Sequence, residues 1–228
     1  AEVIFVRNTT EGINLVAYAW GLPNLKKNDE VIISLMEHHS NIVPWENLSK
    51  MNGFNVGYVE VHDDGTLDYE AFENVISDRT KIVCLSHVSN VTGIVNDVKR
   101  VAKTAHDYGA LTLVDGAQSV PHLPVNVKDL DVDFFAFSGH KMLGPTGIGV
   151  LYGKSEILDG MVPFHGGGEM IREVYFNPVT KRCSISWNDL PWRFEAGTPN
   201  ICGGIGLMEA IKYLKGIGME NVKKHECM

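Results

Sequence analysis

Short apolar runs rich in β-branched residues alternate along this chain with segments of helical periodicity, and that alternation limits the folds it can adopt. Near-continuous apolar runs are typical of strands in parallel sheets that helices cover on both faces. We therefore predict an α/β fold with a mostly parallel central sheet and helices on both faces. The expected strands are Val3–Val6, Val31–Ser34, Asn55–Val61, Lys81–Ser86, Leu111–Asp115, Phe134–Ser138 and Gly149–Tyr152. The expected helices are Glu11–Trp20, Ile42–Met51, Tyr69–Ile76, Val98–Tyr108 and one near Ile205–Leu214.

Glycines and chain ends add to this organisation. Gly53 and Gly109 follow two helical segments, at positions where helices often end in a left-handed residue. The segment Gly166–Trp192 breaks the alternation, and we expect a long excursion there. The chain enters a strand almost at once, lacks an initiator methionine and stops just beyond a helix. We therefore expect residues 1–228 to form one domain that is a piece of a longer protein, truncated at both ends.

Charge and cysteine content exclude several functions. A net charge of −8 argues against nucleic acid or an anionic membrane as the main partner. No apolar run approaches the length of a membrane span. The four cysteines, Cys84, Cys183, Cys202 and Cys227, lack CxxC spacing, which favours neither a zinc site nor a disulfide framework. A reducing cytoplasm is the expected location.

Four of the predicted strands run into clusters of polar side chains. The endings are Glu37-His38-His39-Ser40-Asn41, His87-Val88-Ser89-Asn90, Asp115-Gly116-Ala117-Gln118 and Ser138-Gly139-His140-Lys141. In open parallel sheets, ligands bind at the carboxyl ends of the strands. The four endings together therefore predict a single crevice.

Lys141 is the candidate nucleophile of this crevice. It follows an apolar strand and lies between Gly139 and Gly144. A lysine amine that is partly desolvated reacts readily with an aldehyde. An isolated lysine at such a place would usually be an ordinary surface residue, but the Ser-Gly-His-Lys context favours a reactive one.

Asp115 is the companion that this chemistry requires. A carboxylate at a buried strand end needs a cationic partner, and a protonated pyridine nitrogen is such a partner. Keeping that nitrogen protonated makes the ring an electron sink. In the absence of Lys141, a helix N-cap would explain Asp115 equally well. Together the two residues predict pyridoxal 5'-phosphate, held by Lys141 as a Schiff base.

Two further groups are candidate cofactor contacts. Thr9 and Thr10 precede a helix whose first N–H groups could bind the phosphate, and Gly12 would permit close approach. Taken alone, this is only an N-cap signal. His38 is the candidate ring-stacking residue, although a histidine pair is usually structural or solvent-facing. The pair could also suggest a metal, but no third ligand lies at a suitable spacing, so we expect none.

Seven motifs, in order and over nearly the whole chain, resemble the class-V aminotransferase family, and most closely its SUF-type cysteine desulfurases and selenocysteine lyases. They are Phe5-Val6-Arg7-Asn8-Thr9-Thr10-Glu11-Gly12, Met36-Glu37-His38-His39-Ser40-Asn41-Ile42-Val43-Pro44-Trp45, Ser86-His87-Val88-Ser89-Asn90, Val114-Asp115-Gly116-Ala117-Gln118, Phe137-Ser138-Gly139-His140-Lys141, Gly144-Pro145-Thr146-Gly147-Ile148-Gly149 and Arg193-Phe194-Glu195-Ala196-Gly197-Thr198-Pro199-Asn200. The resemblance implies the large domain of a fold-type-I pyridoxal-phosphate-dependent transferase.

The resemblance also implies a role for each matching residue. The Schiff-base lysine would be Lys141, with Asp115 at the pyridine nitrogen and Gln118 donating to the ring hydroxyl. His38 would stack on the ring, and Asn90 would lie beside ring and substrate. The implied phosphate ligands are Thr10, Ser138 and His140, and Thr198 from a neighbouring subunit. That last contact implies a homodimer with a shared phosphate site, although Thr198 could instead cap the helix near Ile205.

The implied reaction converts cysteine to alanine and leaves the sulfur as an enzyme persulfide, for transfer to an acceptor protein in iron–sulfur cluster assembly. The family's persulfide cysteine, substrate-binding arginines and small C-terminal domain all lie beyond the matching motifs, and we expect this chain alone to be inactive. Selenocysteine as substrate, another class-V reaction and a non-catalytic truncated piece are the alternatives.

Overall fold

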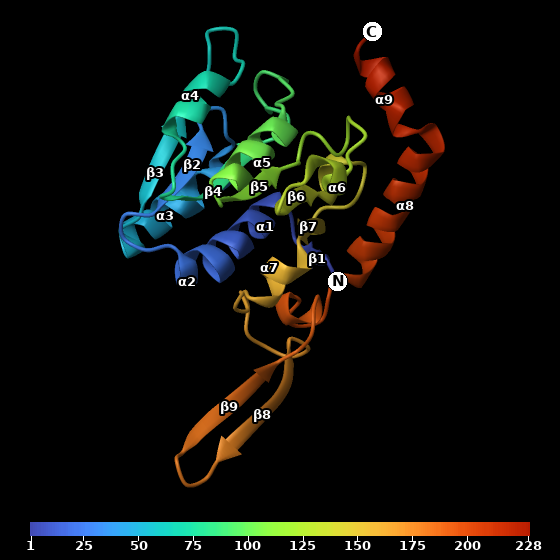
Figure 1. Ribbon diagram of the computed structural model, residues 1–228. Helices are drawn as coiled ribbons and strands as arrows, with labels where there is room; N and C mark the ends of the chain where they lie inside the picture. Colours follow the sequence, from blue (N-terminus) through green and yellow to red (C-terminus); the bar gives the residue numbers. More distant parts are fainter.

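The computed structural model describes residues 1–228 and places seven of the strands in one sheet (Figure 1). The spatial order is β1-β7-β6-β5-β4-β2-β3. The bounds are β1 Val3–Val6, β2 Glu30–Ser34, β3 Asn55–Val59, β4 Thr80–Ser86, β5 Leu111–Asp115, β6 Phe134–Ser138 and β7 Gly149–Gly153. Neighbours from β3 to β6 run parallel, which confirms the predicted sheet. Strand β7 is antiparallel to β6 and β1, because the short connection from β6 is no crossover.

Alternate side chains of the strands pack into two hydrophobic cores, one on each face of the sheet. Val31 and Ile33 of β2 join the core that contains Trp45 of α3, whereas Ile32 joins the core that contains Phe72 of α4. Both faces are therefore covered, as predicted. The helices are α1 Thr9–Val16, α2 Leu22–Asn24, α3 Val43–Asn52, α4 Tyr69–Val75, α5 Val98–Asp107, α6 Val127–Leu130, α7 Ser155–Asp159, α8 Ile201–Ile217 and α9 Met219–Glu226.

Helix α8 extends beyond the predicted Ile205–Leu214 at both ends, and the first helix also departs from its predicted bounds. It begins at Thr9, because Asn8 caps it by accepting a hydrogen bond from the N–H of Glu11. Its last predicted turn is π-helical over Ala17–Gly21. Gly53 and Gly109 have φ angles of 75° and 71°, so both helix ends fall where the glycines predicted.

The segment Gly166–Trp192 contains a hairpin that the sequence analysis missed. Strands β8 (Ile171–Asn177) and β9 (Arg182–Trp187) pair only with each other and project away from the sheet (Figure 1). Alternating Cys183, Ile185 and Trp187 are a period-2 signal that could have revealed β9. Its apolar side chains are exposed, unlike those of the central sheet.

No helix combines the length and apolar composition that crossing a membrane requires.

A buried cluster of charged residues links neighbouring strands at the end of the sheet opposite to the polar strand endings. Asp133, before β6, is 3% exposed and accepts hydrogen bonds from the backbone N–H (2.8 Å) and the hydroxyl (3.0 Å) of Thr112 in β5. Its carboxylate lies 2.8 Å from His106 Nε2 of α5 and 2.9 Å from Lys154 Nζ, which follows β7. One carboxylate therefore connects three consecutive strands and a helix.

Asp133→Ala should lower the free energy of unfolding by about 3–5 kcal/mol, because it leaves Lys154 and the Thr112 N–H without a buried partner. Urea denaturation followed by fluorescence measures this change. Asp131→Asn is the control: this side chain also pairs with Lys154 but is 66% exposed, so its loss should cost less than about 1 kcal/mol. Equal losses in the two variants would show that burial of Asp133 is not what matters.

Candidate active site

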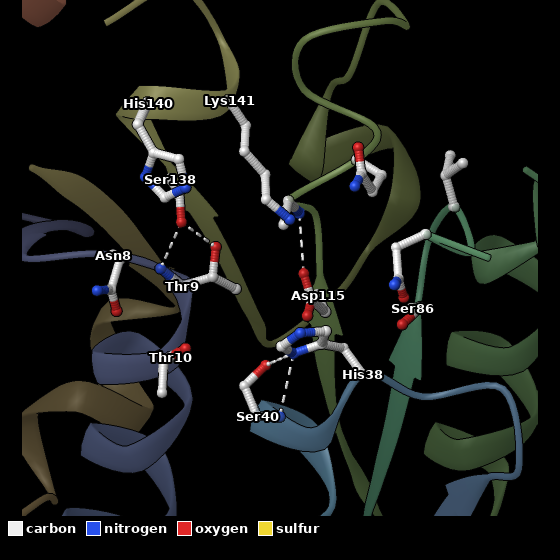
Figure 2. A pocket seen from close by; sticks show the side chains of 14 residues that line it. Asn8, Thr9, Thr10, His38, Ser40, Ser86, Asp115, Ser138, His140 and Lys141 are labelled. Carbon is white, nitrogen blue, oxygen red and sulfur yellow. Dashed lines mark hydrogen bonds between the residues drawn. The ribbon is translucent and has the colours of Figure 1, made fainter. Parts of the chain in front are cut away.

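A polar cavity of about 220 Å³ lies at the carboxyl ends of β4, β5 and β6 (Figure 2). The register pairs Ser86 with Asp115, and Asp115 with Ala136 two residues before Ser138. The cavity is where the polar strand endings predicted a crevice. Its lining residues are Asn8, Thr9, Thr10, His38, Ser40, Ser86, Val88, Asn90, Asp115, Ala117, Gln118, Ser138, His140 and Lys141.

Every predicted site residue except Thr198 lines this cavity, although the role of each stays a prediction. Asn8, Ser40 and Ser86 line it as well, and sequence reasoning gave them no role. Asn8 could have been found, since an asparagine before a helical segment is a common N-cap. Ser86 carries no such signal, because only the fold brings its partner Glu37 close, whereas the spacing of Ser40 from His38 could have indicated a contact.

Lys141 is held in the cavity by a tight turn. It ends the 3₁₀ turn Gly139–Lys141, and the N–H of Gly144 donates to the carbonyl of Gly139 at 2.9 Å. A Cβ atom on Gly139 would lie 2.8 Å from the carbonyl oxygen of Ile148, so only glycine allows this close approach. The Lys141 amine makes no hydrogen bond or ion pair within the chain and points into the cavity (Figure 2).

Asp115 presents one carboxylate oxygen to the chain and the other to the cavity. Its side chain is 5% exposed, and Oδ1 accepts from the N–H of Ala117 at 2.9 Å. Oδ2 has no partner in the chain. Burial raises the pKa of Asp115, and the bond from Ala117 and the charges of Lys141 and His38 only partly oppose this rise. The local capping interpretation thus accounts for one oxygen, and a cationic ligand would account for the other.

The turn after Asp115 depends on the absence of a side chain at Gly116. A Cβ atom there would lie 2.1 Å from the ring of Phe135 in the neighbouring strand β6. The N–H of Gly116 donates to the carbonyl of Ala136 at 2.8 Å. These contacts fix the direction in which Asp115 leaves the sheet, so the glycine is part of how the site is built.

Hydroxyl groups gather between α1 and β6. The backbone N–H of Thr9 donates to Ser138 Oγ at 2.8 Å, and the two hydroxyl oxygens are 2.7 Å apart. The N–H of Glu11 is taken by Asn8, which leaves the N–H of Thr10 as a free donor at the start of α1. The start of α1 can therefore bind an anion. Thr10 and Ser138 are the groups available to that anion, because the N–H and hydroxyl of Thr9 are already bound to Ser138.

The expected role of Gly12 is wrong. Gly12 is buried and does not line the cavity, and a Cβ atom there would meet Cβ of Ala136 at 3.1 Å. The glycine therefore permits α1 to pack closely on β6. It does not permit close approach of an anion.

His38 reaches the cavity from the loop after β2. Its Nδ1 accepts from the backbone N–H of Ser40 at 3.2 Å and lies 2.7 Å from Ser40 Oγ. These two contacts orient the imidazole near Asp115 (Figure 2). Asn90, Gln118 and His140 line the cavity without a hydrogen bond from their side chains to the chain, so their polar atoms are available to a ligand.

Thr198 is not part of this cavity. It lines a second cavity of about 420 Å³ together with Phe5, Arg7 and Glu195. It does not cap α8 either, because Asn200 is the N-cap and accepts from the N–H of Gly203 at 2.9 Å. Within one chain, Thr198 therefore has neither of its two expected contacts.

The four cysteines are free thiols, and none lines the cavity with Lys141. Cys84 is buried in β4, where burial raises its pKa well above the usual value, with the nearby charge of Glu37 as a second cause. Cys183 is exposed on the hairpin, and Cys202 is exposed in the first turn of α8. Cys227 lies beside a neighbouring cavity, next to α9.

Comparison with known proteins places this geometry in a family. A family model described as aminotransferase class-V matches residues 1–227. The cysteine desulfurase of Haloferax volcanii is 55% identical over 225 residues, which are 99% of this chain and 51% of that protein. The crystal structure of the Escherichia coli cysteine desulfurase CsdA, in an S-sulfonic acid form, has a TM-score of 0.91 at 42% identity and covers 96% of this chain and 53% of that one.

The apo cysteine desulfurase of Thermococcus onnurineus NA1 also has a TM-score of 0.91, at 41% identity, covering 98% of this chain and 54% of that one. The chain thus spans about half the length of these relatives. A mostly parallel sheet covered by helices on both faces is the architecture of the fold-type-I pyridoxal-phosphate-dependent enzymes, to which these solved structures belong. Within that class, the chain belongs to the class-V aminotransferase family.

Proposed function

We propose that this chain is the cofactor-binding part of a cysteine desulfurase, which converts L-cysteine to L-alanine and retains the sulfur as an enzyme persulfide. The cavity with Lys141 and Asp115 carries the proposal, in a chain 55% identical to a protein named cysteine desulfurase. Because the chain spans about half of that relative, the activity is proposed for the whole protein.

The cavity fits pyridoxal 5'-phosphate at three points. The free Oδ2 of the buried Asp115 matches a protonated ring nitrogen. The unpaired amine of Lys141 matches the aldehyde. The free N–H of Thr10, the hydroxyl of Ser138 and the side chain of His140 offer donors to the phosphate.

The remaining lining groups complete the proposed binding. Gln118 would donate to the ring hydroxyl, His38 would stack on the ring, and Asn90 would lie beside ring and substrate. Thr9 would act indirectly, since its hydroxyl and N–H already bind Ser138 and so fix that side chain.

The cofactor, when bound, supplies an electron sink for bonds broken at the substrate Cα. The carboxylate of Asp115 would keep the ring nitrogen protonated. Nζ of Lys141 would accept the Cα proton, which is general base catalysis by a positioned amine. His38 would be able to pass a proton through Nε2, because Ser40 fixes Nδ1 and Nε2 makes no hydrogen bond within the chain.

Sulfur transfer needs groups that the cavity does not contain. No thiol and no arginine lines it. We therefore assign the persulfide-forming cysteine and the arginines that bind the substrate carboxylate to the half of the relatives' length that this chain does not cover. A sulfur-acceptor protein and iron–sulfur cluster assembly would follow from that assignment. Separately, the four unpaired cysteines favour a cytoplasmic location.

The chain loaded with cofactor should not release sulfide from cysteine at an enzymatic rate. Loss of a dedicated nucleophile typically costs several powers of ten in rate. The measurement compares sulfide production by residues 1–228 with that of the longer gene product under the same conditions, with an added dithiol that reduces the enzyme persulfide to thiol and sulfide. Rapid sulfide release by residues 1–228 that is lost in Cys183→Ser or Cys202→Ser would mean that the nucleophile is misplaced. A longer product that binds the cofactor without desulfurating cysteine would contradict the proposed function.

Cofactor affinity should rise as the pH rises through the pKa of Asp115 in the cofactor-free chain. Burial raises that pKa, so the carboxyl keeps its proton to a higher pH than an ordinary aspartate. A protonated Asp115 cannot pair with a cationic ring nitrogen, and binding is therefore lost as the pH falls through the raised pKa. Titration of the cofactor at mildly acidic and neutral pH tests this. The cofactor affinity of Asp115→Asn should lack this dependence on pH. A pH profile of that variant equal to that of the original chain would contradict the prediction.

We also propose a homodimer in which Thr198 contributes to the phosphate site of the partner subunit. Two observations support it: Thr198 has no contact with the cavity of its own chain, and Ile201, Ile205 and Met208 leave one face of α8 apolar and exposed. Mixing Thr198→Ala chains with Lys141→Ala chains should restore one full-affinity site per mixed dimer. No restoration in verified mixed dimers would mean that Thr198 acts within its own chain.

A further inference from the structure

Glu37, at the end of the loop after β2, is a buried carboxylate that the proposed chemistry does not use. It is 6% exposed and accepts four hydrogen bonds. Oε1 accepts from Ser34 Oγ at 2.5 Å and from the backbone N–H of Ser86 at 2.9 Å. Oε2 accepts from Asn41 Nδ2 and from Ser86 Oγ, each at 2.7 Å. Every acceptor position of the carboxylate is therefore occupied by a donor of the chain.

This arrangement is costly for the fold. No lysine, arginine or histidine pairs with Glu37, and burial raises its pKa despite the four hydrogen bonds. A buried carboxylate without a cationic partner is tolerated only when hydrogen bonds satisfy it fully. Local conflicts of this kind are expected at functional sites. Glu37 thus requires an explanation that packing does not give.

The four donors belong to segments that the cavity depends on. Ser34 ends β2, and Ser86 ends β4, where it pairs in register with Asp115 of β5. Asn41 belongs to the 3₁₀ turn His39–Asn41, which begins at His38. Glu37 therefore connects the edge of the sheet that carries Asp115 with the turn that carries the imidazole of His38.

The turn has no other hydrogen bond to the strands. Within residues 38–41, the N–H of Asn41 binds the carbonyl of His38, and His38 Nδ1 binds Ser40, so both contacts are internal. The carbonyl of His39 accepts from the N–H of Ile42, just before α3, and the side chain of Asn41 provides the contact with Glu37. His38 lies between these two anchored residues, which makes its position depend on the carboxylate of Glu37.

We propose that Glu37 is a positioning residue that holds the His38 turn against the strand ends, so that the imidazole stays beside Asp115. Because Glu37 would act through His38, its importance for catalysis rests on the proposed function. The positioning itself is a property of this chain and can be measured without cofactor.

The test uses NMR spectra of the chain prepared with carbon-13-labelled histidine and follows the ring resonance of His38. That resonance is assigned by its disappearance in His38→Gln. Glu37→Ala should shift or broaden this resonance. Asp133→Ala is the matched control, because Asp133 is also a buried carboxylate with donors from several segments, but at the opposite end of the sheet. It should lower stability and leave the His38 resonance in place.

A second pair of variants covers the case in which Glu37→Ala does not fold. Asn41→Ala and Ser34→Ala each remove one of the four donors, but only the first severs the link to the His38 turn. Asn41→Ala should move the His38 resonance and Ser34→Ala should not. Equal effects of these two variants, or a His38 resonance in Glu37→Ala that superposes on that of the original chain, would overturn the proposal.

Cofactor affinity provides the second readout and separates the two proposals. Glu37→Ala should weaken pyridoxal phosphate binding roughly tenfold, and should weaken it no further in the His38→Ala background. Full additivity of the two substitutions would overturn action through His38. If the original chain binds no cofactor while the His38 resonance still responds to Glu37→Ala, the proposed function is wrong and the positioning role stands.

Discussion

Lys141→Ala should reduce the rate of Cα hydrogen exchange in a bound amino acid by about 100- to 10,000-fold, the usual contribution of a positioned general base. This exchange needs only the cofactor and the amine, so it does not depend on the sulfur-transfer groups that the cavity lacks. Proton NMR of L-alanine in deuterated water, with the cofactor-loaded chain, measures the loss of the Cα proton signal. The variant should still fold, because the Lys141 amine makes no hydrogen bond or ion pair that the structure would lose.

Lys103→Ala is the matched control. Lys103 is a surface lysine of α5 that pairs with Asp107, and the two side chains are 77% and 60% exposed. The substitution should leave the exchange rate unchanged. Exchange by Lys141→Ala at the rate of the control variant would show that another group takes the Cα proton.

Asp115→Asn is expected to slow the same exchange by about 100- to 1000-fold, in the range found when a single electrostatic contact to developing charge is removed. Asparagine retains the size of the side chain and the oxygen that accepts from Ala117, but it cannot hold a proton on the ring nitrogen. The electron sink is then weakened while the turn at Gly116 is kept. The fold should therefore survive, and unfolding curves of the cofactor-free chain check this.

Asp63→Asn serves as the control for removing a carboxylate charge, since Asp63 is an exposed loop residue. A slow exchange rate in both variants would indicate a general effect of net charge. An exchange rate in Asp115→Asn equal to that of the original chain would mean that Asp115 has only its local contact with Ala117.

Much of this site could be predicted because it depends on order along the chain. Each polar ending follows an apolar run directly, and parallel strands bring their carboxyl ends to one edge regardless of how the strands are arranged. Lys141 and Asp115 could therefore be assigned to one crevice before the strand order was known. The antiparallel direction of β7 could also have been predicted, because the connection between Ser138 and Gly149 is too short for a crossover.

What the sequence did not reveal depends on partners far apart in the chain. Glu37 meets Ser86 across 49 residues, and Thr9 meets Ser138 across 129. Gly12 was misread for the same reason, since the atom that excludes a side chain there belongs to Ala136 on another strand. The hairpin β8–β9 was missed because β9 is marked by an alternation of apolar and polar residues, not by a continuous apolar run like those of the central sheet.

The central claim is that Lys141 binds pyridoxal phosphate covalently in the cavity at the carboxyl ends of β4, β5 and β6. The direct measurement is borohydride reduction of the chain incubated with pyridoxal phosphate, followed by proteolysis and mass spectrometry of the labelled peptide. Reduction should fix one cofactor on the peptide that contains Ser138 to Lys141, at the lysine, and Lys141→Ala should prevent it. A cofactor fixed on any other lysine, or equal labelling of Lys141→Ala, would contradict the claim.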